Sequence, residues 1–159
     1  MSERYESFQR QNGERAKRGE DSNSEDPDGN WWIIPGIIDE AGYRQLEVWK
    51  KGMVIVDAVY GIGEQMPRHE QYGLTAQMQE ASASVPANLA EGYTSGTDGM
   101  YLRHVRIACG SAAELETHLL IARRRAFVMP SQVDPVLKQL VQLRKSLYGL
   151  RNYLRKELQ

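Results

Sequence analysis

The sequence predicts an all-α fold, an antiparallel up-down four-helix bundle. Four successive segments after residue 42 repeat apolar side chains every three or four residues, the spacing that aligns them on one face of a helix. Short stretches containing glycine, proline or helix-capping residues separate these segments. Short connections make consecutive helices antiparallel neighbours, and a chain of 159 residues, 41% of them hydrophobic, suits one such domain.

The first two helices are expected between Tyr43 and Gly92. The first ends before Pro67, and the second follows the turn at residues 66–73 and ends at Gly92, which is suited to a C-cap. The seam predicted for the first helix consists of Leu46, Trp49, Met53, Val56 and Tyr60. The seam predicted for the second helix consists of Leu74, Met78, Ala81, Val85 and Leu89.

The third helix is expected to be capped by Thr97, and the fourth to open with a variant capping box at residues 131–134. Glu116 falls within the apolar face of the third helix, so we expect it to be buried and hydrogen-bonded, near Asn88 or Tyr72. That face consists of Leu102, Val105, Cys109, Ala112 and Leu119. The fourth seam consists of Val136, Leu140, Leu143, Leu147, Leu150, Leu154 and Leu158.

Two isoleucines of the third helix, Ile107 and Ile121, fall within its otherwise polar stripe. A helix that is apolar beyond one stripe is expected to touch more than its own bundle. This pattern predicts contacts with another subunit.

Pro86 stands inside the second helix, where its ring removes a backbone hydrogen bond and predicts a bend after Ser82. The residues around it are small, and Gly110 and Ser111 begin a matching small patch on the third helix. We therefore expect helices two and three to pack closely at these positions.

The chain divides into three regions by composition. Residues 1–30 are polar and almost free of aliphatic side chains, which predicts a disordered tail. Residues 31–42 begin with the apolar run WWIIPGII and are expected to form an anchor strap against the bundle or a neighbouring subunit. Residues 43–159 form the bundle.

Several classes of protein are excluded by what the sequence lacks. No apolar run approaches the roughly 18 residues of a membrane span, and the first residues do not resemble a signal peptide, which indicates a cytoplasmic protein. Cys109 is the single cysteine, so it forms no internal disulfide and is expected to serve packing in a reducing compartment.

An enzyme is not expected, and neither is a cofactor. The Glu-x-x-His motif of di-iron bundles precedes none of the three histidines, and neither a Walker loop nor a GxSxG elbow occurs. Glu114 and His118 have the spacing to share a metal, but an isolated pair favours a surface ion pair. Asn88, Glu91 and Glu116 are interpreted as polar groups that fix helix register rather than as an acid site.

Positive charge gathers at the C-terminal end of the chain. Residues 99–159 hold eleven basic and four acidic side chains, a balance of +7, whereas the whole chain carries −1. Such a surface attracts polyanions or an acidic partner, although lysine and arginine also coat bundles for solubility. The expected nucleic-acid contacts are Arg103, Arg106, Arg123, Arg124, Arg125, Lys138, Arg144, Lys145, Arg151, Arg155 and Lys156.

Several short motifs carry a family resemblance over about residues 46–154. They are Tyr72-Gly-Leu, Gln77, SVPANLAEG at 84–92, Gly110-Ser111 and ELET at 114–117. Together they resemble the bacterial four-helix bundle family first noticed as reading frames within intervening sequences of large-subunit ribosomal RNA genes. The resemblance marks Pro86, Asn88, Glu91, Gly110, Ser111, Glu114 and Glu116 as structural motif residues.

This family is similar to the accessory variability determinant of diversity-generating retroelements. That similarity implies a homopentameric ring that binds RNA or DNA and a reverse transcriptase. Gln79 and Glu80 replace an arginine pair of the family pattern, which moves the expected contacts to helices three and four. Two alternative functions are expected. The first is a nucleic-acid-binding accessory that acts with a reverse transcriptase or in ribosomal RNA intervening-sequence biology. The second is an oligomeric protein-interaction scaffold without nucleic-acid binding.

Overall fold

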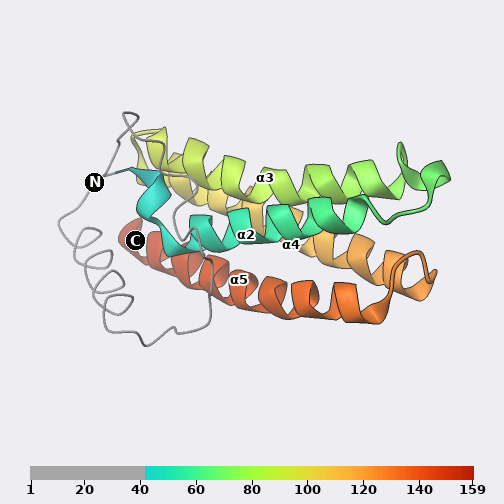
Figure 1. Cartoon of the computed structure of the whole chain (residues 1–159). Helices are drawn as coiled ribbons and strands as arrows, with labels where there is room; N and C mark the ends of the chain where they lie inside the picture. The colour runs from blue at the N-terminus through green and yellow to red at the C-terminus, as the bar shows by residue number, and fades with distance from the viewer. Residues whose placement is uncertain (1–41) are drawn as a thin grey trace.

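The computed structural model describes residues 42–159, and within this range the protein is all-helical, without a strand. Four long helices lie side by side along one axis (Figure 1): α2 (Glu47–Gly63), α3 (Leu74–Thr94), α4 (Asp98–Arg124) and α5 (Pro130–Glu157). Consecutive helices pack together and α2 also packs against α5, so the bundle closes around one core. The predicted four-helix fold is confirmed. The expected tail at residues 1–30, and the expected strap except for Gly42, lie outside the described residues.

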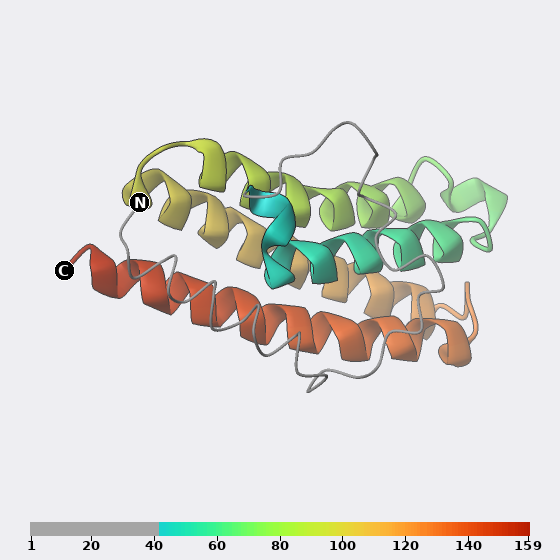
Figure 2. The ribbon, with the colours of Figure 1, turned by 60° about the vertical axis from the view of Figure 1, so that its left-hand side comes forward.

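Two short 3-10 helices complete the fold. The first, η1 (Tyr43–Gln45), contacts both α2 and α3, and the views in Figures 1 and 2 place it across the start of α2. The second, η2 (Arg68–Glu70), lies in the connection between α2 and α3. The first predicted helix therefore starts four residues later than expected, because the backbone is extended at Leu46.

Local capping explains the other helix ends. The Thr97 hydroxyl accepts a bond from the Met100 amide at 3.4 Å, as the sequence predicted. α5 begins at Pro130 rather than in the predicted box at 131–134, and the Gln132 side chain accepts a bond from the Met129 amide at 3.0 Å. α3 continues past Gly92 to Thr94, so the predicted C-cap at Gly92 was wrong.

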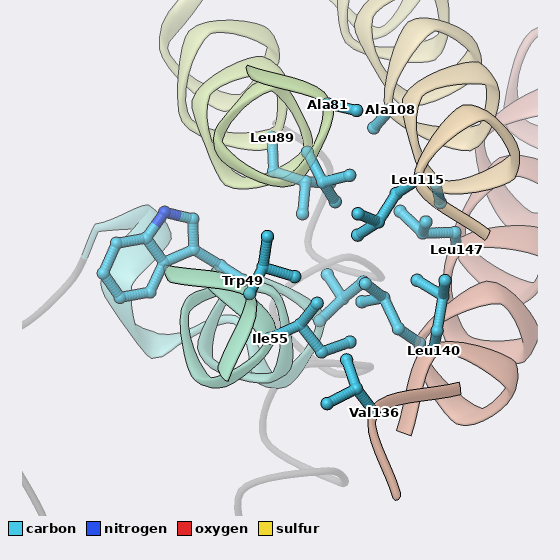
Figure 3. Close-up of a cluster of buried hydrophobic side chains, with 14 of the residues drawn as sticks. Trp49, Ile55, Ala81, Leu89, Ala108, Leu115, Val136, Leu140 and Leu147 are labelled. Carbon is cyan, nitrogen blue, oxygen red and sulfur yellow. The ribbon is translucent and has the colours of Figure 1, made fainter. Parts of the chain in front are cut away.

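The core runs the length of the bundle, and Figure 3 shows side chains from all four helices meeting in it. The predicted α5 seam is buried from Val136 to Leu154, whereas Leu158 is half exposed. On α2 the prediction was wrong for the part of the seam nearest the C-terminal end of the helix. Tyr60 is 49% exposed, and the stripe that faces the core consists of Val48, Gly52, Ile55, Val59 and Ile62.

The expected close packing of α3 against α4 around Pro86 is confirmed at Ser84 and Ser111, and Pro86 itself contacts α2. Pro86 is buried against α2, where its side chain lies 3.6 Å from the position a Cβ would take on Gly52. The contact to α4 is made two residues before Pro86, where the hydroxyls of Ser84 and Ser111 lie 2.8 Å apart. Gly110 has open space around it and does not belong to this interface, because it lies on the outer face of α4.

Candidate nucleic-acid interface

Two ion pairs fix how α4 and α5 face each other. Near one end of the seam the Arg123 guanidinium donates to the Asp134 carboxylate, with bonds of 2.7 and 3.3 Å. Seven residues away along α4 and ten along α5, Arg144 donates to Glu116. The antiparallel register defined by these pairs places the α4 and α5 basic residues on two neighbouring helices, along what we call the α4–α5 seam.

Exposed basic side chains form two lines on the outer surfaces of the two helices that flank this seam. Arg106 and Arg124 on α4 are 18 residues apart, five full helical turns, so both lie on one face. Lys138, Lys145 and Lys156 on α5 are 7 and 11 residues apart, spacings that also keep one face. Each line spans about 27 Å at 1.5 Å per residue. All five side chains are exposed.

Acidic side chains do little to cancel this charge. Of the four acids in residues 99–159, Glu116 and Asp134 are each paired with an arginine of the opposite helix. Residues 42–98, which hold α2 and α3, carry seven acids and four bases, a balance of −3. The positive charge of the described residues therefore lies on α4 and α5, whereas α2 is neutral and α3 carries two acids and no base.

Arg144 and Arg151 do not stand free, although both were predicted as ligand contacts. Both guanidinium groups lie over the ring of Tyr148, at 5.8 and 4.9 Å from its centroid. The Tyr148 hydroxyl also accepts a bond from Arg144 at 3.1 Å, and this bond raises the pKa of that guanidinium. Sequence reasoning missed Tyr148, although the spacing Arg144, Tyr148, Arg151 places all three on one helix face.

The other basic residues predicted to contact nucleic acid also include some that pair within the protein and some that do not. Arg123 is bonded to Asp134, which raises its pKa, and Arg125 lies over the Phe127 ring at 5.7 Å. Arg103 and Arg155 are exposed. The exposed members of the predicted set are Arg103, Arg106, Arg123, Arg124, Arg125, Lys138, Lys145, Arg155 and Lys156, whereas Arg144 and Arg151 are half-buried.

Cys109 lies half-buried on α4, near Arg144 and Arg151 of α5. Burial raises the pKa of its thiol above the ordinary value of 9.0, and the positive charges of Arg151 and Arg144 lower it by less. The thiol is therefore protonated at neutral pH and is a poor nucleophile.

The polar motif residues lie mainly at the contact between α3 and α4. The Asn88 amide donates to the Ser84 carbonyl at 2.9 Å, and its oxygen lies 3.2 Å from His104 Nδ1. Glu91 Oε2 lies 3.7 Å from the same imidazole and is largely exposed. Glu116 pairs with Arg144 instead of Asn88 or Tyr72, and Tyr72 is 98% exposed.

No metal cluster is formed within residues 42–159. Glu114 Oε1 lies 3.6 Å from His118 Nε2, but no group of three histidine, cysteine or acidic side chains comes together in this range. None of the helices in this part of the chain has the length and apolar character needed to cross a membrane.

Comparison with known proteins identifies the family. No curated protein matches the chain. A solved structure with a similar fold is a protein of unknown function from the S23 ribosomal protein family of Bacteroides thetaiotaomicron. It is 16% identical with a TM-score of 0.61, and the match covers 65% of this chain and 97% of that one, a likeness of fold. Residues 44–149 match the family described as 23S rRNA-intervening sequence protein. Because this match spans well over half of the chain, the protein belongs to the 23S rRNA-intervening sequence protein family.

Proposed function

We propose that the protein is a non-enzymatic, oligomeric accessory protein that binds RNA or DNA through the α4–α5 seam. The observation that carries this proposal is the pair of exposed basic lines, Arg106 and Arg124 on α4 and Lys138, Lys145 and Lys156 on α5. Phosphate contacts supply most of the affinity in binding without sequence preference, and two lines of cations along a seam suit a phosphate backbone.

The absence of net positive charge from α2 and α3 supports one orientation. A polyanion is attracted to the +7 balance of residues 99–159 and repelled by the −3 balance of residues 42–98. Glu80 is exposed on α3, at a position where the family resemblance leads one to expect a basic side chain. Contacts are therefore proposed for α4 and α5 and not for α3.

Assembly makes a modest basic face effective. The five exposed cations of the two lines bind weakly at physiological salt when they act alone, whereas several copies in one oligomer engage the same nucleic acid together. The resemblance implies a homopentameric ring, and we propose self-association with a cytoplasmic role beside a reverse transcriptase or in ribosomal RNA intervening-sequence biology.

The test removes one line of charge. Lys138, Lys145 and Lys156 are replaced by glutamine, and binding of labelled single- and double-stranded probes is followed by fluorescence polarisation between 50 and 200 mM salt. The slope of log affinity against log salt should fall by about 2 to 3 in magnitude, since each lost phosphate contact contributes about 0.7 to 0.9.

The matched control replaces Lys50, Lys51 and Arg68 by glutamine. These residues carry the same charge but belong to α2 and the following loop. This variant should keep the slope of the unmodified protein. Equal losses in both variants would show that only net charge matters, and a flat titration of the unmodified protein at 50 mM salt would favour the scaffold without nucleic-acid binding.

A further inference from the structure

Helix α2 carries a second apolar stripe beside the one that faces the core. Trp49, Met53, Val56 and Tyr60 follow one another at spacings of 4, 3 and 4, and this line is about 17 Å long. Its cover decreases along the helix: Trp49 is 7% exposed, Met53 and Val56 are half-buried, and Tyr60 is 49% exposed. Among residues 42–159, no element covers the stripe toward the C-terminal end of α2.

The start of the described chain covers the first part of this stripe. The Tyr43 ring of η1 meets the Trp49 ring edge to face, with 5.5 Å between the ring centroids. Figure 3 shows the Trp49 indole directed away from the cluster formed by Ile55, Leu115 and Leu140, on the outer side of α2. Because η1 contacts both α2 and α3, the described part of the chain begins over the α2–α3 seam.

Small side chains border the stripe on α3. The close approach of Gly52 to Pro86 and of Gly63 to Gln79 fixes the register of the two helices. This register places Ala90 level with Trp49 and Ala83 level with Val56. Ala83 is exposed and Ala90 is half-buried, so neither side chain covers the stripe. An extended segment therefore has room to lie along the seam against Val56 and Tyr60.

We propose that the apolar segment 31–38 of the same chain docks along this stripe, with Ile38 near η1 and Trp31 toward Tyr60. Four residues, 39–42, separate Ile38 from Tyr43 and span at most about 14 Å. Eight extended residues span about 26 Å, enough for the 17 Å stripe, and Pro35 disfavours a continuous helix. Six of the eight side chains are tryptophan or isoleucine, which gain by leaving water.

The tether selects the segment of the same chain over that of a second copy. A four-residue connection holds segment 31–38 beside the stripe at an effective concentration in the millimolar range, far above micromolar protein. This docking is independent of the proposed nucleic-acid binding, because it concerns the side of the bundle opposite to the α4–α5 seam.

Disulfide trapping tests the docking in the full chain. Cys109 is first replaced by alanine, which removes the single native thiol. Ile34→Cys is then combined with Tyr60→Cys, and in the control with Val141→Cys, a position of similar exposure on α5. The Tyr60 pair should form a disulfide within one chain under mild oxidation, and the Val141 pair should not. Peptide mass spectrometry of mixed heavy- and light-labelled chains separates cross-links within a chain from those between chains.

Three results would overturn the proposal: no disulfide with Tyr60→Cys, equal trapping at both positions, or trapping only between chains. A second measurement avoids cysteine. Val56→Glu should increase acrylamide quenching of the tryptophan emission, because Trp31 and Trp32 lose their cover, whereas Val141→Glu should leave it unchanged. Circular dichroism identifies any variant that has lost its helices, and unchanged quenching in a folded Val56→Glu variant would also contradict the docking.

Discussion

At the scale of single residues, the pair formed by Glu116 and Arg144 shows how a predicted ligand contact became a structural one. Both side chains are about 30% exposed, and the bond crosses from α4 to α5. Arg144 also bonds the Tyr148 hydroxyl, so three groups on two helices hold one another in place. The pair fixes the seam on which the exposed cations stand.

Replacing Glu116 by alanine should lower the free energy of unfolding by about 1 kcal/mol, because Arg144 loses one charged partner but keeps Tyr148. Urea denaturation measures this change. Glu114→Ala is the matched control, since Glu114 is 60% exposed and its change should stay within about 0.5 kcal/mol. A double-mutant cycle with Arg144→Ala should give a coupling of similar size, and zero coupling would show that the pair contributes nothing.

Burial was predicted correctly for side chains whose spacing along the helix is compatible with only one environment. The leucines of α5 form a single stripe between polar positions, so their burial follows from spacing alone. Partners of charged residues depend instead on the register between two helices. For this reason Arg123 and Arg144 appeared free in the sequence, although each meets an acid 11 or 28 residues away.

At the scale of helices, α2 shows where periodicity stops being sufficient. The stripe that faces the core and the second stripe, from Trp49 to Tyr60, are both apolar. Spacing alone therefore does not say which of the two faces the bundle. The core stripe contains Gly52 and Gly63, where α3 approaches closely, and neither contributes to an apolar pattern. The second stripe is richer in large side chains, and the sequence pattern therefore predicts it, incorrectly, as the seam that faces the core.

Close approach also decides how α3 meets α4, and Gly92 tests this contact. A Cβ on Gly92 would lie 2.7 Å from His104 Cβ and 2.8 Å from the Tyr101 ring, too near for either to remain in place. Gly92→Ala should therefore destabilise the fold by about 1 to 3 kcal/mol. Gly110→Ala, with open space around it, should instead stabilise by about 0.5 to 1 kcal/mol. Equal thermal shifts for the two variants would contradict this packing.

At the scale of the whole molecule, the helices of the bundle differ in surface character. The α4–α5 pair is basic, α2 is neutral, α3 is weakly acidic, and α4 presents two isoleucines toward solvent. The fold class and the basic end were predictable because both are properties of composition and spacing along one chain. Contacts of these isoleucines beyond the bundle were not predictable, since they would involve a surface that the single chain does not contain.

The outer face of α4 predicts self-association. Ile107 and Ile121 are 41% and 42% exposed, and the 14 residues between them keep both near one face about 21 Å long. We expect a homo-oligomer at micromolar concentration, with the mass of five chains if the ring implied by the resemblance forms. Multi-angle light scattering measures this mass. Replacing both isoleucines by aspartate should yield monomers, because two charges would be buried unpaired at the contact. Val54 and Val141, 44% and 43% exposed on α2 and α5, provide the control, and their double aspartate variant should remain assembled. A monomeric unmodified protein would remove the ring from the proposed function, and the nucleic-acid face would then have to act with the cations of one subunit alone.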